Sequence, residues 1–291
     1  IILGINAHHA DASAAIVVDG KLVAAVEEER IRRIKHWAGF PTAAIRYCLQ
    51  TAGVSINEVD HVAVNRDPNA RLWQRAKFIL ASRPSPSAIR RRLANRSKIR
   101  DLRSELVEEF RLDSLEPKLH NVEHHQAHIA SAFFVSPFED AAVLSVDGFG
   151  DFASTMLAEG RGNRFEVLER VIYPDSLGIF YTAVTQWLGF PKYGDEGKVM
   201  GLAPYGKPRL VGKMRDLVRL DGPLFELGLD YFTHDKEGVD MTWYVCAPTG
   251  GLSDSDKLVD TFGPAREYRG ELTKHEEDVA AALQTRLEEV Y

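Results

Sequence analysis

Three closely spaced histidines are the side chains of this sequence best suited to bind a metal ion. His124, His125 and His128 follow Glu123 in a run that predicts a helix over about 124–135. A helix turns by about 100° per residue, so His124 and His128 share one face and could hold one divalent ion. His125 and His128, three residues apart, also meet this requirement, so the choice of pair stays open on spacing alone. Glu123 is a candidate hydrogen-bond partner for the second ring nitrogen of a bound histidine.

A carboxylate that could complete such a site follows the apolar strand predicted over 141–146. Asp147 comes directly after this strand and precedes Gly148, Gly150 and Asp151 in a predicted polar turn. Two imidazoles and one carboxylate suit iron, zinc or manganese better than calcium or magnesium. The alternative is that Asp147 and Asp151 only form the turn, because Asp-Gly sequences do so without a ligand.

A second polar loop, over residues 8–13, follows the apolar strand predicted for residues 1–6. Its His9 and Asp11 could act on a substrate, or could simply hydrogen-bond backbone amides at a turn. Residues 13–29 then predict a hairpin that turns at Asp19-Gly20. The acidic run 27–30 at its end is interpreted as a solvated strand terminus.

A strand, a polar loop and a hairpin therefore occur twice, over 4–29 and 145–171. This duplication is typical of the actin and sugar-kinase class, in which both loops face a nucleotide between two similar halves. The expected fold class is α/β, an actin-like ATPase (ribonuclease H-like, duplicated) fold of mixed sheets with flanking helices. The expected domains are 1–140 and 141–291, the second of them incomplete.

Charge is distributed unevenly along the chain. Of a net charge of −6, residues 66–103 contribute +10, from twelve Lys or Arg against two Asp, so the remainder carries −16. This segment belongs to a basic helical insertion predicted over 66–111, with helices at about 69–82 and 87–111. The insertion is interpreted either as a solvated helical face or as a surface that attracts phosphates.

The second half contains a glycine-rich stretch, 194–206, after an amphipathic helix predicted over 178–189. Four glycines there would allow close backbone approach to a ligand, and Glu196 and Lys198 could pair with a polar substrate. The stretch lacks the spacing of a Walker phosphate loop.

Composition excludes some classes of protein. No apolar run approaches the roughly 20 residues of a membrane span. Cys48 and Cys246 are too few for a disulfide framework, which favours a cytoplasmic location. Because the chain starts without Met and its last helical pattern, 274–291, has no stop signal, we expect it to be part of a longer protein.

Taken together, these motifs resemble those of the O-carbamoyltransferases, which include nodulation, cephem and tobramycin carbamoyltransferases. The resemblance runs in order from residue 1 to about 206, and the final helix fits as well. The matching segments are Gly4–Ala7 with His9, Asp11–Ala15, Val23–Arg30, Lys35-His36 with Phe40-Pro41, Glu123–Phe133, Ser145–Asp151, Gly194–Gly206 and Asp278–Gln284.

The resemblance implies an actin-like domain that passes a carbamoyl group from carbamoyl adenylate to a hydroxyl of a small molecule such as a sugar, a nodulation factor or an antibiotic. A separate C-terminal YrdC-like domain would make the adenylate from carbamoyl phosphate and ATP. The family's pattern maps the metal, Fe²⁺ before Zn²⁺ or Mn²⁺, onto His124, His128 and Asp147, and implies a further aspartate past residue 291. We assign catalytic roles to His9 and Asp11. Contacts with ATP or carbamoyl adenylate are assigned to Ser13, Gly148, Gly150, Asp151, Glu196 and Lys198.

Two alternative functions remain at this point. One is a tRNA-modifying threonylcarbamoyl-type transferase, for which the basic insertion would bind RNA, although the sparse aromatics argue against nucleic acid. The other is a non-catalytic, actin-like nucleotide-binding module. Neither would require a membrane.

Overall fold

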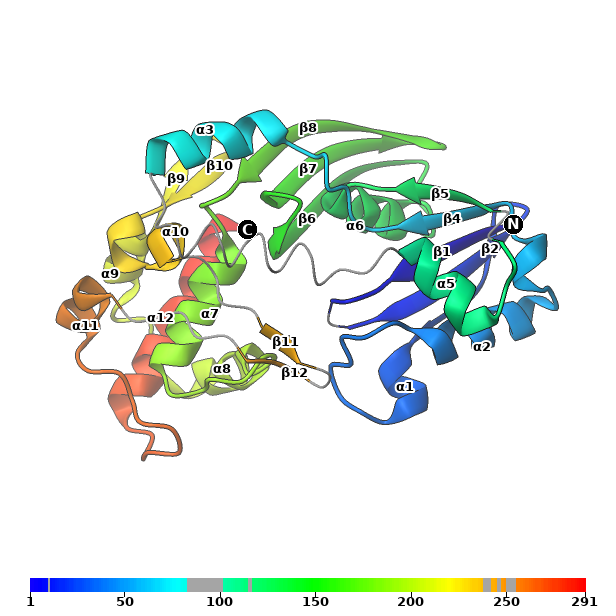
Figure 1. Cartoon of the computed structure of the whole chain (residues 1–291). Helices are drawn as coiled ribbons and strands as arrows, with labels where there is room; N and C mark the ends of the chain where they lie inside the picture. The colour runs from blue at the N-terminus through cyan, green and yellow to red at the C-terminus, as the bar shows by residue number, and fades with distance from the viewer. Residues whose placement is uncertain (10, 83–101, 115–116, 238–241, 245–246, 250–254) are drawn as a thin grey trace. The chain divides into compact units, whose positions relative to one another are not determined.

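The structure, a computed structural model, describes residues 1–9, 11–82, 102–114, 117–237, 242–244, 247–249 and 255–291. The chain forms two compact units (Figure 1). Unit 1 comprises Ile1–Ala70, Pro86–Pro137 and Thr242–Pro248, and unit 2 comprises Arg71–Ser85, Phe138–Met241 and Thr249–Tyr291.

Unit 1 is built on a mixed five-stranded sheet in the order β3-β2-β1-β4-β5. Strand β1 pairs antiparallel with β2 and parallel with β4. The predicted hairpin is present: Asp19 and Gly20 both have positive φ, as a tight turn between twisted strands requires. The strands are β1 (Ile2–Asn6), β2 (Ser13–Val18), β3 (Lys21–Glu27), β4 (His61–Val64) and β5 (Lys118–Asn121).

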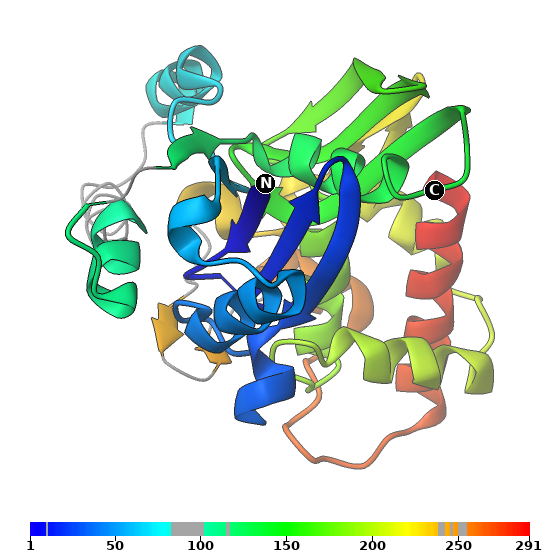
Figure 2. The same cartoon turned by 90° about the vertical axis from the view of Figure 1, so that its right-hand side faces the viewer.

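Helices cover this sheet and close its core. Helix α2 packs on β2 and β3 (Figure 2) and ends where Gly53 adopts φ 69°. Helix α5 adds Leu106, which is fully buried in the same core. The basic insertion thus contributes a core helix, while the rest of its second predicted helix, 87–101, lies outside the described residues. The helices are α1 (Glu28–Arg32), α2 (Thr42–Ala52), η1 (Ile56–Glu58), α5 (Leu102–Phe110) and α6 (His124–Phe133).

Unit 2 contains an antiparallel three-stranded sheet in the order β6-β7-β8. The strands are β6 (Asp140–Gly150), β7 (Ala153–Arg161) and β8 (Arg164–Ile172). The predicted polar turn 147–151 is wrong in its bounds, because β6 continues to Gly150 and the turn residues are Asp151 and Phe152. A register shift between Val146 and Gly150 lets the strand continue through this segment.

Helix α12 contacts α7, α8 and α9 (Figure 1) and contributes Val279, Ala280, Ala282 and Leu283 to the unit 2 core. Its N-terminus carries a capping box formed by Thr273 and Glu276. The helices are α3 (Leu72–Ser82), α7 (Leu177–Trp187), α8 (Glu196–Leu202), η2 (Ala203–Tyr205), α9 (Val211–Leu217), η3 (Leu229–Tyr231), α10 (His234–Glu237), α11 (Asp256–Phe262) and α12 (Lys274–Val290). The short strands of unit 2 are β9 (Val218–Asp221) and β10 (Leu224–Leu227). Strand β11 (Thr242–Tyr244) belongs to unit 1, as do the first two residues of β12 (Ala247–Thr249).

The predicted α/β class is confirmed. A mixed sheet in the order 3-2-1-4-5, with an antiparallel hairpin on one side and parallel strands on the other, is the arrangement of the actin-like, ribonuclease H-like class. Within the described part of the chain, no helix has both the length and the apolar composition that crossing a membrane requires.

Candidate functional site

Helix α6 brings two of the three clustered histidines together at their tips. The Nε2 atoms of His124 and His128 lie 3.0 Å apart, and their ring centroids are separated by 4.6 Å. Two imidazole nitrogens this close could bind one ion with little rearrangement. His125 is completely buried, whereas His128 is exposed, so the geometry favours the pair His124 and His128 over a pair that includes His125.

Two further contacts of α6 lie within unit 1. Glu123 is the N-cap residue of the helix, and its carboxylate accepts a hydrogen bond of 2.9 Å from the amide of Gln126. This cap fixes the start of the helix and hence the orientation of its first histidine. The ring of His9 lies 6.0 Å from that of His124, so the first loop approaches the histidine helix.

The loop of residues 8–13 is held by several bonds from the segment that follows α1. The amide of Ala12 donates to Trp37, and the amide of His8 donates to Gly39, both to backbone carbonyls. Asp11 hydrogen-bonds His36 through its side chain, with 2.9 Å between Oδ1 and Nδ1. Ser13 begins β2 opposite Asn6. The structure therefore gathers His9, Asp11 and the histidine helix within unit 1.

Glu28 is a buried carboxylate that the sequence interpretation missed. The acidic run was expected to be solvated, but the Glu28 side chain is completely buried. Its carboxylate accepts hydrogen bonds from the amides of Ala43 (3.2 Å) and Ala44 (2.7 Å) at the start of α2, and from Arg32 (2.6 Å). An anionic acceptor at a helix N-terminus stabilises the unpaired amides there. The helix α2 has Pro41 at its N-cap position and therefore no side-chain cap of its own. This missing cap is the signal that another residue, here Glu28, must supply the acceptor.

In unit 2, Asp147 lies where β6 approaches the N-terminus of α7. Its Oδ1 accepts a hydrogen bond of 2.6 Å from the amide of Gly148, and the hydroxyl of Ser176 donates to the carbonyls of both residues. A Cβ at Gly178 would lie only 2.7 Å from the amide nitrogen of Gly148, so glycine is needed for this close approach. Asp147 belongs to unit 2, whereas the histidine pair belongs to unit 1.

Asp151 is engaged by α3 within unit 2. The guanidinium of Arg71 donates to the Asp151 carbonyl at 2.8 Å, and that of Arg75 lies 3.9 Å from its carboxylate, which is almost buried. Phe78, on the same helix, packs edge-on against Phe152 and Tyr173. The first helix of the predicted basic insertion is thus part of unit 2 and directs two of its arginines at the turn after β6.

The glycine-rich stretch is helical over Glu196–Leu202. Glu196 accepts a hydrogen bond of 2.7 Å from Thr182, and Lys198 forms an ion pair of 2.6 Å with Asp195. Burial and the charge of Glu196 raise the pKa of Tyr181, so its phenol stays protonated and donates to a side chain of α12. These contacts fix α8, and a role of Glu196 and Lys198 toward ATP stays a prediction.

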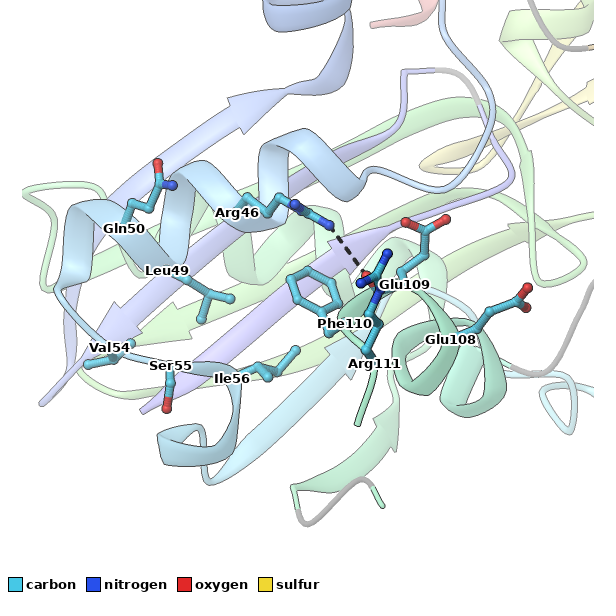
Figure 3. Close-up of a pocket in the computed structure, with 10 residues that line it drawn as sticks. All are labelled: Arg46, Leu49, Gln50, Val54, Ser55, Ile56, Glu108, Glu109, Phe110 and Arg111. Atoms are coloured by element: carbon cyan, nitrogen blue, oxygen red, sulfur yellow. Dashed lines mark hydrogen bonds between the residues drawn. The ribbon is translucent and has the colours of Figure 1, made fainter. Parts of the chain in front are cut away.

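A separate cavity of about 840 Å³ lies between α2 and α5 in unit 1 (Figure 3). Arg46 crosses it, donating a hydrogen bond of 3.3 Å to the carbonyl of Glu109 and stacking over Phe110. None of the predicted site residues line this cavity. The lining residues are Arg46, Leu49, Gln50, Val54, Ser55, Ile56, Glu108, Glu109, Phe110 and Arg111.

The sheet of unit 1, with the paired histidines of α6 and the hydrogen-bonded loop that carries His9 and Asp11, places the chain in the actin-like class. Comparison with known families identifies the family within this class. The model of the carbamoyltransferase N-terminus matches residues 1–291. The chain therefore belongs to the carbamoyltransferase family, as its motifs predicted.

The chain is also similar to individual proteins. The chain is 39% identical to the uncharacterized protein sll1178 of Synechocystis over 99% of its own length and 46% of that protein. It is 38% identical to the nodulation protein NolNO of Sinorhizobium fredii over 68% of its length and 28% of that protein. The chain thus spans less than half the length of these relatives. Among solved structures it is similar to YeaZ from Pseudomonas aeruginosa, with a TM-score of 0.31 and 14% identity over 60% of this chain and 67% of that one.

Proposed function

We propose that the protein that carries this chain transfers a carbamoyl group from carbamoyl adenylate to a hydroxyl of a small molecule. The adenylate would come from carbamoyl phosphate and ATP, in a C-terminal YrdC-like domain. Membership of the carbamoyltransferase family is the observation that carries the proposal, because it specifies the group transferred. The acceptor class and the use of ATP rest on the motif resemblance.

The histidine pair fits a divalent metal, because both Nε2 atoms already converge to 3.0 Å. We propose that His124, His128 and Asp147 bind the ion, with Fe²⁺ as the first expectation and Zn²⁺ or Mn²⁺ next. A bound ion would polarise the carbamoyl carbonyl and orient the adenylate phosphate.

Residues of the first loop would act on the acceptor. Carbamoyl adenylate is a mixed anhydride and is already activated, so the protein must mainly orient the hydroxyl and remove its proton. His9 and Asp11 are proposed for this task, and Ser13, Gly148, Gly150 and Asp151 for contacts with the nucleotide. A His9→Ala variant that transferred at the normal rate would remove His9 from this role.

The test uses labelled carbamoyl phosphate, ATP and hydroxylamine, a small nucleophile that traps an activated carbamoyl group as hydroxyurea. ATP-dependent trapping by the protein supports the proposal, and its absence overturns it. The double variant His124→Ala with His128→Ala should lose both bound metal and trapping.

The chain offers a matched control for this variant. His61 and His120 form a second histidine pair, with 2.9 Å between ring nitrogens, on the neighbouring strands β4 and β5. The double variant His61→Ala with His120→Ala should keep both the metal and the activity. Equal metal loss in the two double variants would contradict the assignment of the ion to α6.

A further inference from the structure

The segment between α1 and α2 places one histidine, His36, in direct contact with the first loop. His36 has φ 56°, in the left-handed region that non-glycine residues rarely adopt. Two bonds hold it there: its amide donates to Glu29 at 2.8 Å, and its Nδ1 lies 2.9 Å from Oδ1 of Asp11. A backbone conformation that is both uncommon and fixed by polar contacts is often found where a side chain must be positioned.

Asp11 is accessible enough to meet an acceptor. Its side chain is 34% exposed, whereas that of His36 is 20% exposed. Among the residues that the structure describes, the bond to His36 is the only hydrogen bond of the Asp11 carboxylate. The imidazole therefore engages Oδ1 and leaves Oδ2 available to a hydroxyl. Charged groups near the pair include Glu29, which also contacts Arg30 at 3.3 Å, and the neighbouring Lys35.

We infer that His36 is a positioning residue for Asp11 in the proposed transfer, and that Asp11 rather than His36 receives the proton of the acceptor hydroxyl. The inference rests on the proposed function and extends it. As the hydroxyl oxygen bonds to the carbamoyl carbon, its O–H bond breaks and the proton passes to Oδ2 of Asp11. The bond between the carbamoyl carbon and the phosphate oxygen then breaks, AMP leaves with that electron pair, and Asp11 releases the proton to solvent. His36 donates through Nδ1 and keeps the carboxylate in one orientation throughout.

Two substitutions of His36 distinguish the effect of losing its side-chain donor from the effect of changing its backbone conformation. Asparagine tolerates the left-handed region and offers an amide N–H near the position of Nδ1, whereas glycine tolerates the same backbone but offers no donor. We expect His36→Asn to transfer within about threefold of the wild-type rate. We expect His36→Gly to transfer to a hydroxyl about 10- to 100-fold more slowly, the range expected when a reacting group is misplaced.

The readout compares two acceptors of the same activated carbamoyl group in the full protein. Molar glycerol must lose a proton to attack, whereas hydroxylamine attacks as its free base. Both His36→Gly and Asp11→Asn should lower transfer to glycerol relative to hydroxylamine. In the double variant the two effects should not add, because His36 acts through Asp11.

The outcomes are distinct for the two proposals. A wild-type protein that carbamoylates neither acceptor overturns the proposed function. A wild type that uses hydroxylamine but not glycerol overturns hydroxyl activation by Asp11. Equal activity of His36→Gly and His36→Asn, additive effects with Asp11→Asn, or equal loss with both acceptors in His36→Gly would each overturn the positioning role. Loss of bound metal in His36→Gly would instead assign His36 to a metal site and also overturn it.

Discussion

Replacing Glu28 by alanine should destabilise unit 1 far more than the same change at its neighbour Glu27. The two residues are adjacent in an acidic run, but Glu28 is completely buried and Glu27 is 43% exposed. Glu28→Ala removes the acceptor of the buried Ala44 amide and of the Ala43 amide. Hydrogen bonds to a charged group contribute about 1.5–3 kcal/mol each when the partner is left unsatisfied.

We therefore expect Glu28→Ala to lower the free energy of unfolding by about 3 kcal/mol, with the stronger bond of Ala44 contributing most. The Arg32 guanidinium is 39% exposed, so water replaces its lost partner at little cost. Glu27 contacts Arg30 at the surface, and its removal should cost about 0–1 kcal/mol. Glu28→Gln keeps the shape of the side chain but not its charge. Its loss of unfolding free energy should lie between those of Glu28→Ala and Glu27→Ala.

Urea-induced unfolding followed by circular dichroism measures this difference, and hydrogen exchange localises it. In Glu28→Ala the amides of Ala43 and Ala44 should exchange faster, because the first turn of α2 loses its acceptor. If the two alanine variants differ by less than about 0.5 kcal/mol, or if exchange at the start of α2 is unchanged, the capping role of Glu28 is refuted.

Further predictions concern unit 2. Gly178→Ala places a Cβ 2.7 Å from the amide nitrogen of Gly148 and should destabilise the protein by about 1–3 kcal/mol in thermal unfolding, whereas Gly212→Ala, with open space around it, should be neutral or stabilising. Equal effects of the two substitutions would contradict the close packing. His234 is buried, and burial lowers its pKa from 6.5 while its Nε2 donates to Pro174. The neutral His234 ring therefore contributes its full stabilisation above pH 6.5, and this stabilisation is lost as the pH falls through the lowered pKa. His234→Gln, which does not ionise, should reduce this acid sensitivity in urea unfolding between pH 7.5 and 5; an unchanged pH dependence would exclude His234 as its source.

Features encoded by neighbouring residues could be predicted from the sequence. Asp19-Gly20 specifies the hairpin because both residues accept positive φ, and Gly53 ends α2 for the same reason. The meeting of His124 and His128 follows from helical geometry alone. Each of these depends on contacts within a few residues, so the local pattern contains the information.

The stretch 194–206 shows why the rest could not be predicted in this way. Its glycines were interpreted as allowing a ligand to approach the backbone closely, and Gly197 and Gly201 lie inside α8 with open space where a side chain would stand. Gly206 is required for a different reason: a Cβ there would overlap the backbone carbonyl of Glu277 in α12. That contact joins residues 71 positions apart in the sequence, and no local pattern indicates it.

The same limit applies to the loop that carries Asp11. Its backbone is bonded to Trp37 and Gly39, and His8 pairs with the nearly buried Glu105 of α5 at 2.6 Å. Sequence spacing could nominate Asp11 as a polar loop residue, but it could not distinguish a turn residue from a positioned carboxylate. The difference lies in distant partners: His36 is 25 positions from Asp11, and Glu105 is 97 positions from His8. A helix from the basic insertion thus helps to hold the loop, which gives part of that insertion a structural role that its charge alone did not suggest.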